Sequence, residues 1–423
     1  MNTKVDSINT HILPGSTPKP RFLDGIAKRM LFKKLSDIDH GIIRITDNDE
    51  THEFGLLTDQ CQLVVDLFIY DSRFYSDLAY GGSIGAGESY MSKYWDTNNL
   101  TDLIRIMVLN QDVLNSIDGS WAMVTEPLQK ALHWLNRNTQ RGSRKNIAAH
   151  YDLGNDLFEL MLDKTMMYSC AVYPNTKSSL HEAQLYRLEK VCDKLKLKPD
   201  DHLLEIGTGW GGLSIYAANN YGCKITTTTI SQEQYNLACE RIKQEGLEDK
   251  ITVLLQDYRN LTGKYDKLVS IEMIEAVGHQ YFDTYFKQCS SLLKPDGLML
   301  LQAITIADQR YASAKRSVDF IQRYIFPGSC IPSNTAMLGS ITSSTDMNVI
   351  DLDDIGQHYV RTLSDWRHNV FINVDKLKER GYSDEFLRMW EFYLCYCEGG
   401  FAERAISDVH ILLAKTGYRS QVI

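Results

Sequence analysis

The chain has 423 residues, 43% of them hydrophobic and 23% charged, and its formal net charge is −9. This length favours two or three domains, each able to bury its own core. The acidic balance argues against wholesale nucleic-acid binding, which depends on neutralising phosphates. No apolar run approaches the roughly 18 residues of a membrane-spanning helix.

The N-terminal sequence and the cysteines indicate a cytoplasmic protein. The first residues, MNTKVDSINTHILPG, lack the apolar core and the small-residue cleavage site of a secretory signal. The nine cysteines form no CxxC pair and no zinc-finger spacing. We therefore expect reduced thiols and no metal site.

The first part of the chain predicts a small α+β domain. Residues 21–35 have the spacing of an amphipathic helix, with basic residues at Lys28, Arg29, Lys33 and Lys34. Strand-like sequence then extends to about residue 76, and includes GIIRITD and LVVDLFIY. The glycine-rich stretch 81–95 predicts a connection into a helix.

A polar, basic segment marks the expected domain boundary. Residues 127–151 contain no Asp or Glu but several Lys and Arg, so we place an N-terminal accessory domain over 1–137 and a second domain over 138–423. This stretch and the basic helix suit contact with an anionic membrane face, where each Lys or Arg contributes about 1 kcal/mol. An ordinary surface helix, or a homodimer contact, is the alternative role.

Helix and strand patterns alternate from about residue 180 onward. A helix at 179–196 is followed by five strand-like segments with helices between them: HLLEIG, KITTTTI, ITVLLQD, DKLVSIEMI and LMLLQAIT. This order is typical of the α/β class, with a doubly wound, Rossmann-like sheet. Ligands of such sheets bind beyond the carboxyl ends of the strands.

A glycine-rich turn, EIGTGWGG, follows the first of these strands. A dinucleotide fingerprint would carry an acidic residue about 20 positions further on, but Thr226–Thr229 lie there, which disfavours NAD. Glu205, two residues before Gly207, instead matches the acidic residue of S-adenosylmethionine (SAM) methyltransferases, where a carboxylate suits a cationic ligand. Asp257, at the end of the third strand, stands where such enzymes contact adenine, and a strand-end cap is its alternative role.

Seven segments in the second domain carry a more specific pattern. They are HYDLGNDLFELMLDKTMMYSCAVYP (150–174), LLEIGTGWGG (203–212), TTISQEQ (228–234), EMIEAVG (272–278), RYIFPGSCIPS (323–333), HYVRTLSDW (358–366) and YLCYCEGGFAERAI (393–406). Together they closely resemble the family of cyclopropane-fatty-acyl-phospholipid synthases and mycolic acid methyltransferases. The N-terminal region resembles, more loosely, the extra domain of the phospholipid-acting members.

The resemblance implies a SAM-dependent enzyme that adds a methylene to the cis double bond of unsaturated phospholipid acyl chains at a membrane surface. The alkene would take the methyl group and become a carbocation, and bound bicarbonate would remove a proton so that the ring closes. The protein must align the reactants and exclude water. The residues implied to contact SAM are Tyr168, Ser169, Gly207, Gly209, Gly211, Thr229 and Gln234. The ring of Tyr168 would favour the sulfonium by cation–π attraction.

The resemblance also implies a bicarbonate pocket. Its members would be Cys170, Glu275, Ile304 and Tyr359, with Glu275 accepting from the protonated oxygen of the anion. Cys397 matches an active-site cysteine of the family, but the mechanism gives a thiol no obvious role, so a structural role is the alternative.

Two positions depart from the family's usual pattern. Gln302 stands where many members have His, and Ala276 follows Glu275 where many have His. Gln302 could still donate to bicarbonate through its amide, but it cannot titrate. A methylene- or methyl-branched product therefore stays open beside the cyclopropane ring.

Two further functions stay open at this point. A SAM methyltransferase acting on an amine or hydroxyl of a small molecule would need neither vesicles nor bicarbonate. A catalytically silent SAM- or lipid-binding protein would hold SAM without transferring its methyl group.

Overall fold

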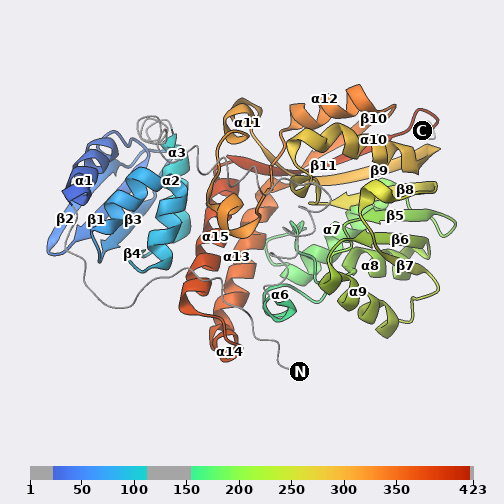
Figure 1. Ribbon diagram of the computed structural model, residues 1–423, viewed down its shortest axis with the longest axis horizontal. Helices are drawn as coiled ribbons and strands as arrows, with labels where there is room; N and C mark the ends of the chain where they lie inside the picture. Colours follow the sequence, from blue (N-terminus) through green and yellow to red (C-terminus); the bar gives the residue numbers. More distant parts are fainter. Residues whose placement is uncertain (1–21, 112–153, 420–423) are drawn as a thin grey trace.

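The computed structural model describes residues 22–111 and 154–419, which form two sheets with helices packed around them (Figure 1). The predicted boundary between residues 137 and 138 and the basic segment 127–151 lie outside the described residues. In the described ranges, no helix is long and apolar enough to cross a membrane.

The N-terminal domain is a four-stranded sheet covered by helices. Its sheet has the order β2-β1-β3-β4. Its elements are α1 (Phe22–Leu35), β1 (Gly41–Asp47), β2 (Glu50–Leu56), β3 (Val64–Ile69), α2 (Arg73–Met91), β4 (Trp95–Thr97) and α3 (Leu100–Leu109). The predicted helix at 21–35 and the strands at 41–47 and 64–69 are confirmed.

The glycine-rich stretch 81–95 lies mostly within α2, which begins at Arg73 and ends at Met91, so the expected connection into a helix is a break between two helical parts at Gly82. The expected strand pattern up to residue 76 is wrong only at its end, because α2 begins at Arg73. Gly82 breaks the helix with φ 54° and ψ −133°, a conformation that glycine adopts easily. The glycines therefore mark a kink within one helical segment.

The second domain is a seven-stranded sheet of order β10-β11-β9-β8-β5-β6-β7. Five strands are parallel, and the strands β10 and β11 extend the sheet in antiparallel fashion. The strands are β5 (His202–Ile206), β6 (Lys224–Thr229), β7 (Ile251–Leu255), β8 (Tyr265–Ile271), β9 (Leu293–Ile306), β10 (Asn348–Asp354) and β11 (Ile406–Ala414). The predicted Rossmann-like α/β sheet is thus confirmed.

Helices cover both faces of this sheet because its strands bury alternate side chains on each side. One face packs on α7 (Leu180–Leu195), α8 (Gly212–Tyr221) and α9 (Gln232–Gln244). The other packs on α10 (Phe282–Leu292) and α12 (Asn334–Ser344). The remaining helices are α6 (Asn155–Met161), α11 (Asp308–Ala314), α13 (Gly356–Ile372), α14 (Val374–Glu379) and α15 (Asp384–Ala402), with a π-helical turn at Ile321–Ile325.

The long helices α13 and α15 stand between the two sheets (Figure 1). Helix α15 packs against α13 on one side and against α2 and α3 of the N-terminal domain on the other. Ion pairs reinforce this contact, for example between Arg105 and Glu403 at 2.7 Å. The two domains therefore share a core on α15.

Candidate functional site

A cavity of about 1640 Å³ opens at the carboxyl ends of the parallel strands. The glycine turn after β5 and the ends of β6, β8 and β9 line one part of it. Helices α13 and α15 line another part, and from there the cavity continues into the N-terminal domain. A single hollow thus joins both domains.

The glycine turn brings its backbone close to the cavity. Gly207, Gly209 and Gly211 have φ values of 100°, 51° and 84°, in the left-handed region that favours glycine. A side chain on Gly212 would place its Cβ 2.3 Å from the carbonyl oxygen of Thr165, so this glycine permits close packing of the neighbouring segment. Gly207 and Gly209 line the cavity, whereas Gly211 does not.

Glu205 lies beneath this turn. Its Oε2 accepts hydrogen bonds from Ser214 at 2.5 Å and from Thr227 at 2.7 Å. Burial raises the pKa of the Glu205 carboxyl to about 7. A cation entering the cavity beside Glu205 would therefore favour its ionised form.

Three further residues predicted to contact SAM follow β6 and β7: Thr229 ends β6, Gln234 lies in the first turn of α9, and Asp257 comes just after β7. Thr229 donates to Oε1 of Gln234 at 2.8 Å, and both line the cavity. Asp257 also lines it, but its carboxylate accepts from Arg259 at both oxygens, at 2.8 and 2.7 Å, and caps a short 3₁₀ turn. The strand-end cap weighed as its alternative role is present.

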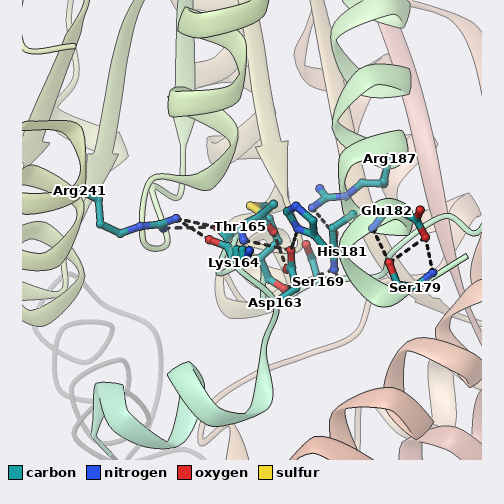
Figure 2. A network of polar contacts seen from close by, with 11 residues as sticks. Asp163, Lys164, Thr165, Ser169, Ser179, His181, Glu182, Arg187 and Arg241 are labelled. Atoms are coloured by element: carbon teal, nitrogen blue, oxygen red, sulfur yellow. Dashed lines mark hydrogen bonds and ion pairs between the residues drawn. The ribbon is translucent and has the colours of Figure 1, made fainter. Parts of the chain in front are cut away.

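The segment 163–169 is held from two sides (Figure 2). From α9, Arg241 donates to the carbonyl oxygens of Lys164 and Thr165. From α7, His181 contacts Asp163 at 2.7 Å. Gln184, also on α7, donates to the carbonyl oxygen of Ser169 at 2.9 Å. These bonds fix the backbone that presents Tyr168 and Ser169 to the cavity.

Tyr168 lies among aromatic rings. Its ring centroid is 5.2 Å from that of Phe158 and 5.2 Å from that of Trp366, and its hydroxyl lies 2.7 Å from the hydroxyl of Tyr393. Aromatic faces stabilise a nearby cation by cation–π attraction. They also leave little room for water.

A carboxylate that the sequence analysis did not single out lies at the centre of the site. Glu272 follows the end of β8 and lines the cavity. Its Oε1 accepts from the backbone N–H of Cys170 at 2.8 Å and from Nε2 of Gln302 at 2.8 Å. Its Oε2 accepts from the hydroxyl of Tyr359 at 2.7 Å.

Glu275 is a second carboxyl on the same turn. Its Oε1 accepts from the backbone N–H of Ile304 at 2.6 Å. Its Oε2 is buried without a hydrogen-bond partner within the described residues. Burial, and then the charge of Glu272, raise the pKa of Glu275 to about 8, so this carboxyl is mostly protonated at neutral pH.

The strand β11 contributes two more members of this polar cluster. Nε2 of Gln302 also donates to Asp408 at 2.8 Å, and Oε1 of Gln302 lies 3.1 Å from Nε2 of His410. Burial raises the pKa of Asp408 well above its usual range and lowers that of His410 to about 3. Arg187, wholly buried on α7, supplies a positive charge to the cluster.

Two cysteines of the predicted site are present as neutral thiols. Burial raises the pKa of Cys170 and that of Cys397 far above neutral pH. Cys397 lines the cavity from α15, but Cys170 does not, and its contribution is its backbone N–H. A thiolate is the reactive form of cysteine, so neither is set up as a nucleophile.

Comparison with known proteins identifies the family. The model of the family described as mycolic acid cyclopropane synthetase matches residues 138–411. This chain belongs to that family.

Similar curated proteins and solved structures agree with this assignment. The cyclopropane-fatty-acyl-phospholipid synthase of Escherichia coli K12 is 37% identical over 355 residues, which cover 83% of this chain and 88% of the relative. The tuberculostearic acid methyltransferase UfaA1 of Mycobacterium tuberculosis is 37% identical over 327 residues, 76% of each chain. The mycolic acid cyclopropane synthase CmaA1, solved with SAH and CTAB, is 28% identical with a TM-score of 0.60, and covers 64% of this chain and 98% of that chain. The protein is a SAM-dependent methyltransferase of the cyclopropane synthase family, acting on lipids.

The residues present fit SAM. The turn at Gly207 and Gly209 opens to the cavity, and Ser169 has a buried hydroxyl that finds no hydrogen-bond partner in the part of the chain that the structure describes. Thr229 at the end of β6 and Gln234 at the start of α9 offer polar groups. Together with Glu205 and Tyr168, they would hold a cationic ligand.

The residues present do not fit bicarbonate. The resemblance placed Cys170, Ile304 and Tyr359 around the anion, and Gln302 was expected to donate to it through its amide. The donors at these positions are the backbone N–H groups of Cys170 and Ile304, the hydroxyl of Tyr359 and the amide of Gln302. Each of them donates to a protein carboxylate instead. In particular, Gln302 gives its amide to Glu272 and Asp408 and does not line the cavity.

The cluster around Glu272 was missed because its members come from separate segments. Glu272 lies three residues before Glu275 in EMIEAVG, and a carboxylate at the end of a parallel strand could have been noted from that position alone. Asp408 and His410 lie on β11, whose pairing with β9 is set by the sheet and not by a local pattern. Arg187 lies on α7, and the sequence pattern of this helix predicts only that one of its faces is buried.

Proposed function

We propose that this enzyme transfers a methylene from SAM to the cis double bond of unsaturated phospholipid acyl chains, forming cyclopropane fatty acids. One observation carries the proposal: the cavity beside the glycine turn continues into the N-terminal domain as an apolar hollow. Its lining there includes Leu35, Ile45, Leu67, Phe74 and Met107. Such a surface fits the hydrocarbon chain of a lipid better than a small polar amine.

The chain's own residues would perform three tasks in this reaction. When bound, SAM supplies an electrophilic methyl group. The aromatic rings around Tyr168 would favour positive charge and keep water away from it. Gly207 and Gly209 would allow close approach of the ligand to the backbone. The apolar hollow would hold the double bond against the methyl group.

Helix α1 would bring the enzyme to a membrane surface. Lys33 and Lys34 line the outer part of the cavity, and Leu23, Arg29 and Met30 are exposed on the same helix. Basic and apolar side chains together favour adsorption to anionic lipid. A phospholipid could then pass its acyl chain into the hollow while its headgroup stays at the surface.

One of the four predicted membrane contacts is not available for this role. Lys28 forms an ion pair of 2.6 Å with Asp47 and lies over the rings of Phe32 and Tyr75. It therefore binds α1 to its own domain.

A methyl-branched product is the second candidate. It is favoured by the similarity to the tuberculostearic acid methyltransferase, which is as high as that to the cyclopropane-fatty-acyl-phospholipid synthase. Both products begin with the same methyl transfer and differ in the fate of the cation. Proton loss without ring closure gives a methylene branch, and a saturated methyl branch needs a hydride donor in addition.

The test is incubation with SAM and vesicles of cis-unsaturated phospholipid, followed by mass spectrometry and NMR of the fatty esters. We expect a mass gain of one CH₂ group and the upfield proton signals of a cyclopropane ring. A gain of one carbon with a methylene-branch or methyl-branch signal in place of the ring signals would show that the second candidate is the product. Absence of any mass gain would refute both.

A further inference from the structure

We propose that Glu272 is the catalytic base of this reaction and that its carboxylate occupies the place that the family resemblance assigned to bicarbonate. The inference rests on the proposed function and adds to it the residue that accepts the proton. A protein carboxylate here would make the enzyme independent of a dissolved anion.

The hydrogen bonds to Glu272 are those of an anion-binding pocket. Its two oxygens accept from a backbone N–H (Cys170), a phenol (Tyr359) and an amide (Gln302), all at 2.7 to 2.8 Å. A carboxylate and a bicarbonate ion present the same pair of oxygens about one carbon atom, so one can take the hydrogen bonds of the other. With these donors engaged by Glu272, a separate anion would have to compete for them.

The backbone conformation of Glu272 supports a functional role for this residue. Its φ is 46°, a left-handed conformation that is unfavourable for a residue with a side chain. Its N–H donates to the carbonyl oxygen of Gln302 at 2.9 Å, which fixes the turn at the end of β8. Strained residues of this kind gather at active sites, where the surrounding structure holds them.

The surrounding charges favour an ionised Glu272. Burial and the charge of Glu272 raise the pKa of Asp408 well above its usual range, so Asp408 holds the proton of this pair. The hydrogen bonds from Cys170 and Tyr359 and the charge of Arg187 oppose the rise in the pKa of Glu272 that burial causes. Burial thus leaves Glu272 with a raised pKa, which makes it a stronger base than a carboxylate in water.

The proposed step is a proton transfer within the cavity that Glu272 lines. After methyl transfer, one carbon of the former double bond bears the new methyl group and the other carries the positive charge. A C–H bond of that methyl group breaks, its electron pair forms the second ring bond to the cationic carbon, and its proton moves to Glu272. The carboxyl then releases the proton to solvent when the product leaves.

The experiment compares Glu272→Gly with Glu272→Gln. Glycine suits the left-handed backbone and removes the carboxylate, leaving room for a small anion. Glutamine fills the same space but cannot accept the proton. Each variant and the unchanged protein are assayed on unsaturated phospholipid vesicles in decarbonated buffer, and again with added bicarbonate or formate.

We expect the unchanged protein to be equally active with and without bicarbonate. Glu272→Gly and Glu272→Gln should both lose at least about 100-fold in kcat, the usual contribution of a positioned base. Bicarbonate or formate should restore activity to Glu272→Gly but not to Glu272→Gln. Formate should also raise the Tm of Glu272→Gly and leave that of the unchanged protein in place, a readout that requires no turnover.

Two results would overturn the assignment while leaving the proposed function intact. One is activity of the unchanged protein that disappears without bicarbonate. The other is a Glu272→Gln variant that forms product at the normal rate. A failure of the unchanged protein to form any product, by contrast, would overturn the proposed function itself.

Discussion

Replacing Glu275 by Gln should make the protein more stable in alkaline solution. The glutamine side chain can still accept from the backbone N–H of Ile304 through its oxygen. It removes the cost of ionising a carboxyl whose second oxygen is buried without a partner among the described residues. Burying an unpaired charge is strongly unfavourable, and this is why the pKa of Glu275 is raised.

The size and sign of the effect follow from that pKa. The pKa of Glu275 rises from 4.5 to about 8 on folding. Below pH 4.5 the carboxyl is protonated in the folded and in the unfolded state, so it does not change the stability of the protein. Between these values the unfolded chain ionises first, so the folded state loses stability as pH rises. At about 1.4 kcal/mol per pKa unit the full effect is at most about 5 kcal/mol, and coupling to neighbouring carboxyls leaves about 2–5 kcal/mol.

Urea denaturation of both proteins at several values between about pH 5 and about pH 9 would measure this difference. Glu182→Gln is the matched control, because Glu182 is exposed in the capping box with Ser179 and its pKa is lowered. Its effect on stability should stay constant above pH 5. A difference between the unchanged protein and Glu275→Gln that is also constant over this range would refute the reasoning.

Three further changes have definite expected results. Gln302→His should lower both Tm and kcat. The amide of Gln302 donates to two carboxylates, whereas a neutral imidazole has only one N–H. Full activity of this variant would show that the cluster tolerates the loss of one hydrogen bond. Arg187→Met should move the acidic limb of the kcat–pH profile to higher pH, because the charge of Arg187 lowers the pKa of Glu272. Arg187→Lys keeps a positive charge and should move the limb less. An acidic limb that does not move would show that Arg187 does not act on the pKa of the base. Charge reversal at Arg29 and Lys33 together should weaken binding to anionic vesicles in a flotation assay and spare turnover of detergent-dispersed lipid, and unchanged flotation would exclude α1 as the contact.

Much of the fold could be predicted because local patterns determine it. The strand HLLEIG, the glycine turn and the helix that begins at Gly212 follow one another directly in the chain, as a buried strand, a turn and a helix. The strands β10 and β11 could not be ordered in the same manner. The antiparallel pairing of β11 with β9 joins residues about a hundred positions apart, and β10 in turn pairs with β11. Only the assembled sheet decides this order.

The site shows the same division between local and distant information. The glycine turn, Tyr168 and Thr229 line one cavity, as their motifs led us to expect from the resemblance. The partners of Gln302 could not be predicted, because its neighbours are Ile271 on β8 and His410 on β11. The motif showed that an imidazole was absent at this position, but not that two carboxylates use the amide.

The contacts of Cys170 connect the proposed base to the cofactor segment. Its N–H donates to Glu272, and it directly follows Tyr168 and Ser169. If this hydrogen bond alone held the segment, any change at Glu272 would also weaken SAM binding. However, Arg241 and the residues of α7 hold residues 163–169 from two sides, independently of Glu272 (Figure 2). The segment therefore keeps its anchors when Glu272 is replaced, so a loss of kcat at unchanged SAM affinity reports on the base.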